Sequence, residues 1–135
     1  MSDINKAAHR QPAFAEFLGL KVTSVTPERV TAELPAREDF NNRHGIMHGG
    51  AIMALADNLG GTATTANLTQ GQTTTTIESK TNFFAAIPIG DTAYAECVAL
   101  HRGRSTMVWQ TRITRGDGRL CALVTQTQLI LDGKK

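Results

Sequence analysis

The sequence has few of the features that nucleic-acid-binding, membrane-bound and secreted proteins need. One Trp, one Tyr and five Phe are present, which is too few for a surface on which nucleic-acid bases stack. The formal net charge of +2 is too small to favour a polyanion. No apolar run reaches the length of a membrane span, and the polar residues 1–11 lack the apolar core of a signal peptide. We therefore expect a cytoplasmic protein with no nucleic-acid or membrane partner.

Cysteine is also scarce, since only Cys97 and Cys121 occur and they lie far apart in the sequence. They form no C-x-x-C pair, and no cluster of His and Cys has the spacing of a structural metal site. Buried cysteine usually behaves as a small inert side chain. We predict two reduced thiols, each carried by a strand, and no metal.

Turn residues divide the chain into two helices and six strands, and the length suits one domain over residues 1–135. Pro12 and Gly19 bracket a short amphipathic helix. Strands are expected between turn residues, over residues 21–26, 29–34, 73–86, 91–102, 105–114 and 120–131. Because the later strands are long and joined by short links, we predict an α+β fold in which an antiparallel meander wraps over a long helix.

The long helix is predicted from about His48 to Asn67, where apolar residues recur at helical spacing. Gly60 and Gly61 lie inside it, although each glycine costs about 1 kcal/mol relative to alanine in a helix interior. We therefore expect another backbone to pass close to this part of the helix.

The start of this helix gives the strongest indication of function, because residues 42–57 read NRHGIMHGGAIMALAD. Free N–H groups and the positive end of the helix dipole suit an oxygen that becomes negative, and glycine allows a ligand to approach the backbone. In this interpretation the Gly49 N–H polarises a thioester oxygen, and His48 orients the loop or assists that donor. Asn42 could contact the leaving group or position water. The alternative is an ordinary junction between a loop and a helix.

Asp57 is the acid on this helix, and small or apolar residues surround it in the sequence. It is either a solvated or ion-paired carboxylate, or a carboxylate in a groove that attacks a carbonyl or draws a proton from water. The eight steps from Gly49 to Asp57 span roughly 12 Å of helix, so one carbonyl cannot contact both. Two antiparallel helices across a two-fold axis would bring Gly49 to Asp57 of the partner subunit. We therefore expect an obligate dimer.

Two polar segments could add to such a site. β-Propensity alone explains the four threonines at positions 73–76. If this strand passes beside the helix, an inward hydroxyl of Thr74 and Thr76, or of the other pair, could hold a nucleophilic water against Asp57. The turn at residues 101–106 is either a solvated basic turn or a clamp for the phosphates of coenzyme A, formed by Arg102, Arg104 and Ser105.

The pattern Asn-x-x-Gly-x-x-His-Gly-Gly, with an acid nine residues after the histidine, resembles the hotdog-fold acyl-CoA thioesterases of the phenylacetate-pathway (PaaI) type. The resemblance covers roughly residues 15–131. It implies an antiparallel sheet around one central helix, dimers that pair into tetramers, active sites at the dimer interface, and no metal or redox cofactor. It also implies that Asp57 is the nucleophile or general base, Gly49 the oxyanion donor, His48 its neighbour, and Asn42 a contact of the thioester region.

By the same resemblance, a Ser or Thr that the family carries on the next strand falls on Thr76, or on Thr75 if the register slips. Relatives with glutamate at position 57 carry a threonine one turn later, where this chain has Gly61, so the chain is similar to the aspartate branch. A pocket for an aromatic ring or a medium alkyl chain could draw on Phe83, Phe84, Met53, Met47 and Leu59.

The sequence therefore predicts an enzyme that hydrolyses aryl or medium-chain acyl-CoA to the free acid and CoA. The alternative is a non-catalytic hotdog protein that binds or senses acyl-CoA. A dehydratase of the same architecture is disfavoured, because His48-Gly49-Gly50 does not resemble the motif of that class.

Overall fold

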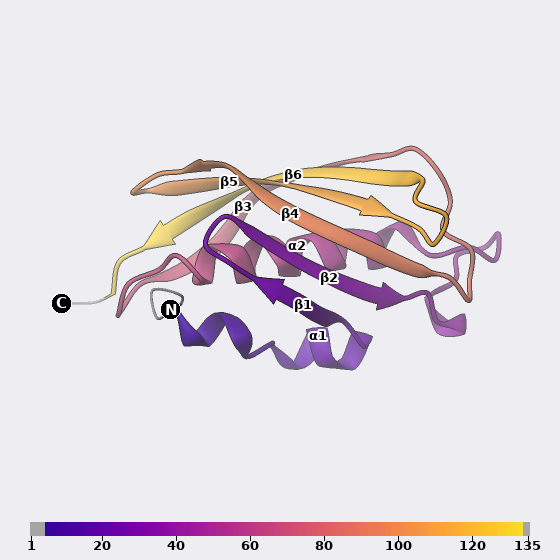
Figure 1. Cartoon of the computed structure of the whole chain (residues 1–135), viewed down its shortest axis with the longest axis horizontal. Coiled ribbons are helices and arrows are strands. Elements are labelled where there is room, and N and C mark those ends of the chain that lie inside the picture. Colours follow the sequence, from indigo (N-terminus) through magenta and orange to yellow (C-terminus); the bar gives the residue numbers. More distant parts are fainter. Residues whose placement is uncertain (1–4, 134–135) are drawn as a thin grey trace.

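The computed structural model describes residues 5–133, which form one sheet, one long helix and several short helical segments. Figure 1 shows strands β4, β5 and β6 above the long helix α2, with β2, β1 and then the short helix α1 below it in this view. Among the described residues, no helix combines the length and the apolar character needed to cross a membrane. The elements are η1 (Lys6–His9), α1 (Ala13–Leu18), β1 (Lys21–Val25), β2 (Arg29–Pro35), η2 (Glu38–Phe40), α2 (Gly49–Thr65), β3 (Thr73–Phe83), β4 (Thr92–Arg102), β5 (Thr106–Thr114) and β6 (Leu120–Leu131).

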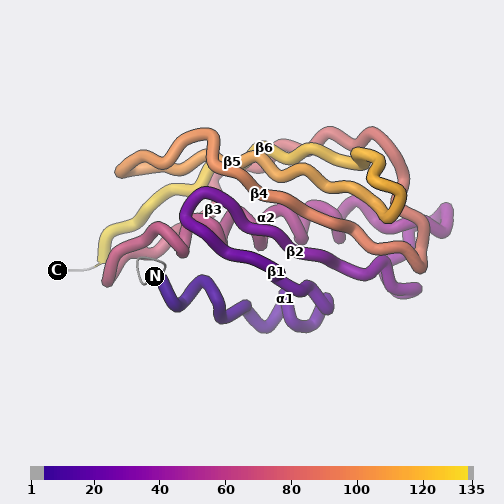
Figure 2. Tube along the Cα trace, viewed as in Figure 1, coloured from indigo at the N-terminus to yellow at the C-terminus, as the bar shows by residue number. Residues whose placement is uncertain are grey.

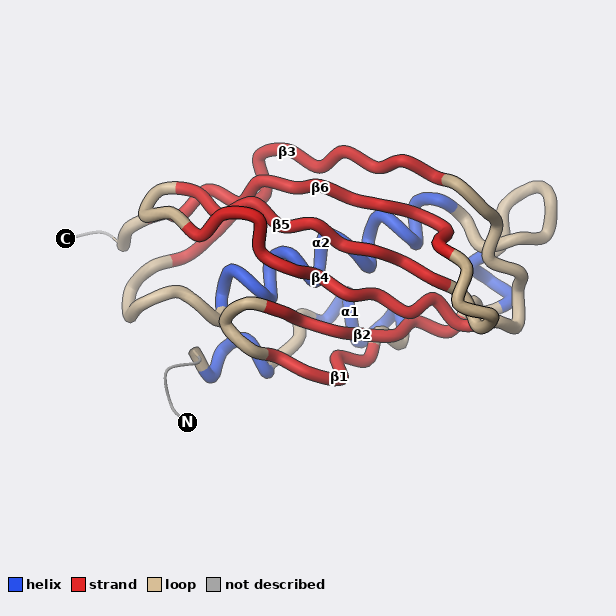
Figure 3. The backbone as a smooth tube through the Cα atoms, turned by 45° about the horizontal axis from the view of Figure 1, so that its top comes forward, coloured by secondary structure: helices blue, strands red, loops and turns tan. Residues whose placement is uncertain are grey.

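The six strands pair antiparallel in the order β1-β2-β4-β5-β6-β3, as Figure 3 shows. This arrangement confirms the predicted α+β fold with a sheet around a central helix. The predicted meander is only partly right. Strands β4, β5 and β6 do follow one another, whereas β3 lies at the outer edge beside β6 and does not pair with β4. The difference arises because α2 carries the chain across the sheet between β2 and β3.

The predicted boundaries differ from the observed ones by three residues or fewer. The largest difference is at the end of β3, which stops at Phe83 because the N–H groups of Phe84 and Ala85 both turn to the carbonyl oxygen of Cys121. The 3₁₀ segments η1 and η2 were not predicted, because segments of three or four residues carry no periodic pattern.

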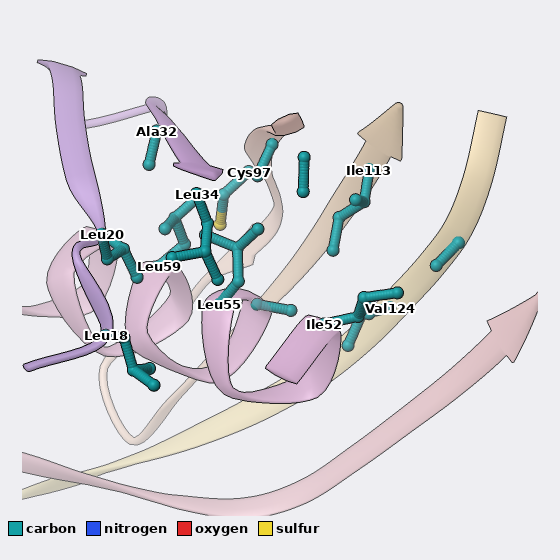
Figure 4. Packing of buried hydrophobic residues seen from close by; sticks show 14 of the residues in the cluster. Leu18, Leu20, Ala32, Leu34, Ile52, Leu55, Leu59, Cys97, Ile113 and Val124 are labelled. Atoms are coloured by element: carbon teal, nitrogen blue, oxygen red, sulfur yellow. The ribbon is translucent and has the colours of Figure 1, made fainter. Parts of the chain in front are cut away.

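One face of α2 lies at the centre of the hydrophobic core. Leu55, Ala56, Leu59 and Ala63 recur at helical spacing and are completely buried. Figure 4 shows side chains from α2 and from the strands of the sheet pointing into one cluster. Burying each leucine contributes about 1.5–3 kcal/mol, so this face fixes the position of α2 relative to the strands.

Trp109 of β5 links the sheet to α2 through a buried hydrogen bond. Its side chain is completely buried, and its Nε1–H donates to the Thr64 hydroxyl at 2.9 Å. The Thr64 hydroxyl in turn donates to the carbonyl oxygen of Gly60 at 2.8 Å. This chain of bonds satisfies the only polar group of the tryptophan.

The Thr64→Val substitution should therefore destabilise the fold by about 1–3 kcal/mol, because it leaves the buried Trp109 N–H without an acceptor. The matched control is Thr65→Val. The Thr65 hydroxyl also donates to a carbonyl one turn earlier, but Thr65 is only half-buried, so its loss should cost about 0.5 kcal/mol or less. Urea denaturation of both variants measures the difference. Equal losses would contradict the importance of the Trp109 bond.

Candidate active site

The start of α2 leaves one backbone N–H group without an acceptor. His48 is the N-cap residue, with extended dihedral angles (φ −62°, ψ 136°), and its Nδ1 accepts the N–H of Gly50 at 2.8 Å. No acceptor within residues 5–133 bonds the N–H of Gly49, the first residue of the helix. The free donor and the positive end of the helix dipole therefore coincide at Gly49.

The two glycines at this helix start make room for side chains of the same protomer. A Cβ at Gly50 would lie 2.9 Å from Nδ1 of His48, and a Cβ at Gly49 would lie 3.1 Å from the ring of Phe83. Gly50 thus permits the histidine cap. Because Nδ1 is an acceptor, the neutral imidazole carries its proton on Nε2. Gly49 allows the aromatic ring to approach the backbone next to the free N–H.

A cavity of about 280 Å³ opens beside Gly49. Among the residues expected for an acyl pocket, Met47, Phe83 and Phe84 line it. The expectation for Leu59 was wrong, because that side chain is completely buried in the core. The fifth, Met53, is exposed on α2 and does not line this cavity.

Asn42 lines the same cavity and also holds the loop before α2. Its Oδ1 accepts the N–H groups of His44 at 2.8 Å and Ile46 at 3.3 Å. The carboxamide oxygen is therefore used within the loop, which leaves the Nδ2 amide as the group of Asn42 that can donate to a ligand.

The Asp57 carboxylate is solvent-exposed and accepts two hydrogen bonds at one oxygen. The Thr76 hydroxyl of β3 donates to Oδ1 at 2.7 Å, and the Gln126 Nε2 of β6 donates to the same atom at 3.4 Å. Of the two threonine pairs left open by the alternation, Thr74 and Thr76 point inward. Thr76, and not Thr75, therefore lies against Asp57.

Two buried glutamines of β6 complete this network, and the sequence analysis missed both. Gln126 and Gln128 are each 1% exposed. The Gln128 Nε2 donates to Thr76 Oγ1 at 2.6 Å, while its Oε1 accepts from the Thr74 hydroxyl at 3.0 Å. The strand alternation could have revealed them, because both occupy inward positions of a strand whose inward face is otherwise mainly apolar.

Asp57 lies in a second, larger cavity of about 470 Å³. Polar residues dominate its lining, including Asn58, Thr62, Thr76 and Gln128. This cavity shares no residue with the one beside Gly49. Within one protomer, the free N–H and the carboxylate therefore face different spaces, which agrees with their separation of about 12 Å along the helix.

The predicted reason for the glycine at position 60 was wrong. We expected a backbone to pass near Gly60, but a Cβ there would overlap the side-chain amide of Gln126. At Gly61 a Cβ would meet no heavy atom within 4 Å in the protomer. Gly60 therefore makes room for a side chain of the neighbouring sheet.

The basic turn between β4 and β5 lies at the opposite end of α2 from Gly49. Figure 2 shows this turn near the segment that follows the helix. The Arg102 guanidinium donates to Asn67 Oδ1 at 3.0 Å and lies 3.7 Å from Glu28 Oε1. Arg104 and Ser105 are exposed. Arg102 thus has partners within the protomer, and the other two side chains face solvent.

Both cysteines are free and buried, as predicted. Burial raises the pKa of the Cys97 thiol to about 12 and also raises that of Cys121. A thiol with a raised pKa is a poor nucleophile at neutral pH. Within residues 5–133, no group of three or more His, Cys, Asp or Glu side chains could hold a metal ion.

Comparisons with known proteins assign this chain to a family. The sequence model of the thioesterase superfamily matches residues 44–122. The proofreading thioesterase EntH of Cronobacter turicensis is 30% identical over 106 residues, covering 78% of this chain and 77% of that protein. This chain belongs to the thioesterase superfamily, as a PaaI-like hotdog thioesterase and hence a thioester hydrolase.

Solved structures share the whole architecture. The PaaI protein of the phenylacetic acid degradation operon of E. coli superimposes with a TM-score of 0.87 at 23% identity, covering 95% of this chain and 91% of that one. Smu.793 of Streptococcus mutans, solved bound to acetyl CoA, superimposes with a TM-score of 0.78 at 24% identity, covering 86% and 91% of the two chains. At these identities the structures support the fold, and the predicted hotdog fold is confirmed.

The buried thiols lead to a prediction about reactivity. In the native protein at pH 8, neither Cys97 nor Cys121 should react with a disulfide reagent on a scale of minutes, since both are buried and have raised pKa values. In denaturant, both should react quickly. Absorbance at the wavelength of the released thiolate follows the reaction. Rapid modification of the native protein would contradict the inert role of these residues.

Proposed function

We propose that this thioesterase hydrolyses acyl-CoA thioesters to the free acid and CoA at two composite sites of a dimer. Each site would combine the Gly49 N–H of one protomer with Asp57 of the partner subunit. The main support is the unpaired N–H at the start of the same helix that carries an exposed acid in a separate cavity. Membership of the thioesterase superfamily and the CoA-bound relative also support CoA thioesters as substrates.

In the proposed reaction, the thioester oxygen lies against Gly49 at the positive end of α2. A preorganised N–H and helix dipole stabilise the negative charge that develops on this oxygen in the transition state. The Nε2–H of His48 and the Nδ2 amide of Asn42 are further donors near this end. The acyl group would occupy the cavity lined by Met47, Phe83 and Phe84.

Asp57 of the partner subunit would act in one of two ways. As a nucleophile it attacks the carbonyl carbon, expels the CoA thiolate and forms an anhydride that water then cleaves. As a general base it removes a proton from a water molecule, which attacks the carbonyl directly. In both routes the carbon–sulfur bond breaks and one water molecule is consumed. Its hydroxyl goes to the acid, and its remaining proton goes to the thiolate, which leaves as CoA.

Exposed apolar residues support an interface along α2 and β3. Met53, Ile77 and Phe83 are 41%, 56% and 51% exposed, and β3 is an edge strand with an unpaired side. Water-exposed apolar groups beside an open strand edge are typical of a surface that another chain covers. By the family resemblance, the proposal extends to pairs of such dimers.

In the proposed dimer, the position of the basic turn at residues 101–106 suits the end of the substrate that carries the CoA phosphates. Ten positions along the chain, eight of them within α2, separate Asp57 from Asn67, which contacts the turn. This corresponds to roughly 15 Å at the helical rise. In an antiparallel pair, the turn of one protomer would lie about that far beyond the thioester. Arg104 and Ser105 would then contact CoA phosphates, and Arg102 would join them from its position beside Glu28.

The Asp57→Asn substitution tests the role of the acid. Turnover of acyl-CoA, followed with a thiol reagent that detects released CoA, should fall by about 10²–10⁴-fold, while the unfolding free energy and oligomeric state stay unchanged. Asparagine keeps an oxygen that can accept from Thr76 and Gln126, so the fold should tolerate it. Unchanged turnover would refute the assignment. Binding of acyl-CoA without release of CoA by the native protein would instead favour the non-catalytic alternative.

The Gly49→Pro substitution tests the oxyanion donor and the composite site together. Proline has no N–H but is tolerated at the first position of a helix, and the extended His48 suits a following proline. Turnover should fall by about 10²–10³-fold. Gly49→Ala is the matched control, because it places the same Cβ near Phe83 and keeps the N–H.

A mixture of the Gly49→Pro and Asp57→Asn proteins should regain activity after unfolding and refolding together. Random assortment makes half of the dimers mixed, and each mixed dimer has one intact site of two, so about a quarter of native turnover should return. No recovery, in a mixture shown to form mixed dimers, would place both groups within one protomer.

A further inference from the structure

The inward face of β6 carries two glutamines where apolar side chains would pack with less cost. Both Gln126 and Gln128 are 1% exposed, and neighbouring inward positions hold Val124 and Ile130. A buried amide must have partners for its donors and its acceptor, or it destabilises the fold. Their presence therefore needs a reason other than core packing.

The Gln126 amide faces Asp57 in a defined orientation. Its Nε2 lies 3.4 Å from Asp57 Oδ1, and a carboxylate can only accept, so the nitrogen and not the oxygen must point to it. The Oε1 of Gln126 is then buried without a hydrogen-bond partner among the described residues. Leaving such an oxygen unpaired destabilises the fold. The structure therefore retains an unfavourable unpaired oxygen at Gln126 together with the Nε2 group that donates to Asp57.

Gly60 also lowers the local stability, because glycine has a lower helix propensity than alanine at an interior position of a helix. A Cβ at this position would overlap all three terminal atoms of the Gln126 side chain. The glycine of α2 and the glutamine of β6 therefore depend on each other. The next glycine, Gly61, has no comparable neighbour.

The second glutamine, Gln128, acts on Asp57 indirectly, through the hydroxyl of Thr76. Gln128 donates to Thr76 Oγ1 at 2.6 Å, and its own oxygen accepts from Thr74. Because Thr76 accepts from Gln128, its single proton is directed to Asp57 Oδ1. Both donors thus converge on Oδ1, and no described residue donates to Oδ2.

We propose that Gln126, which lies against Gly60, and Gln128, which acts through Thr76, are positioning residues that hold Oδ1 of Asp57 and leave Oδ2 as the reacting oxygen. The inference rests on the proposed function, since it assigns a role to the surroundings of the proposed nucleophile or base. Gln126 lines neither cavity. Its loss should therefore lower kcat and leave KM for acyl-CoA nearly unchanged.

The Gln126→Met substitution separates this role from a structural one. Methionine fills a similar volume, removes the donor to Asp57 and also removes the unpaired oxygen. We expect kcat to fall about ten- to hundredfold, KM to stay within about twofold, and the denaturation midpoint to stay equal or rise. The matched control is Gln110→Met, the same change at a half-buried position of β5 whose inward neighbours are Trp109 and Thr111, which should leave kcat unchanged.

A double-mutant cycle with Gly60 provides an independent readout. Gly60→Ala should displace the Gln126 amide and lower kcat as Gln126→Met does. In a Gln126→Ala background the new Cβ has room, so Gly60→Ala should cause no further loss of kcat. Additive losses would contradict the dependence of these two residues on each other.

The failure of this inference differs from a failure of the proposed function. If Gln126→Met lowers the denaturation midpoint and leaves kcat unchanged, the glutamine is structural and the inference is wrong. In an Asp57→Asn background, Gln126→Met should not lower the residual turnover further, and an equal loss there would show that Gln126 acts elsewhere. If Asp57→Asn itself keeps native turnover, the proposed function fails, whatever Gln126 does.

Discussion

A rigid helix fixes the distance between the two groups on which the proposed site depends. Gly49 begins α2 with an unpaired N–H, and Asp57 follows two turns later on the same helix. The buried face of the helix, with Leu55 and Leu59 at its centre, prevents any local change that would bring them together. A separation of about 12 Å is too large for one reacting carbonyl. The division between two cavities, the exposed apolar strand edge and the proposed dimer all follow from this constraint.

Much of the fold could be predicted because its signals are local. The 3.6-residue period marked α2, and turn residues marked every strand to within a few positions. The strand order could not be read in the same way. The pairing of β3 with β6 depends on where α2 ends relative to the sheet. That position is set by how the helix packs against the strands, and not by the local sequence.

The candidate site likewise has parts that could be predicted from the sequence and parts that could not. The histidine and glycines at positions 48–50 and the acid at 57 could be recognised, because a helix start is encoded within a few residues. The choice among four identical threonines could not be made from alternation alone. It depends on the contact of β3 with α2, just before the irregularity in the β3–β6 register between Thr76 and Glu78. Gln126 is inward by its place in β6, but nothing in the sequence shows that Asp57 lies opposite it.

Local departures from good packing gather around Asp57. Gly60 weakens the helix, Gln126 buries an unpaired oxygen, and Gln128 places a second amide in the core. Elsewhere in the described chain, the core around α2 is built mainly from apolar side chains and from Trp109, whose N–H is bonded, although the hydroxyl of Thr111 is also buried without a hydrogen-bond partner. Native proteins concentrate such departures at functional positions, where a fixed geometry is worth more than local stability.

The composite site proposed here explains why one oxygen of Asp57 would need such support. If the oxyanion donor belongs to another subunit, any looseness of the interface adds to any freedom of the carboxylate, and a misplacement of about 1 Å can cost 10²-fold in rate. A free carboxylate can rotate about its side-chain bonds, whereas one held at Oδ1 from two directions presents Oδ2 along a single line. A donor on Oδ2 would instead occupy one of the lone pairs of the oxygen that faces the substrate. In the proposed site, two donors on one oxygen and none on the other would therefore fix the direction of Oδ2 and leave it free to react, as a nucleophile or as a base.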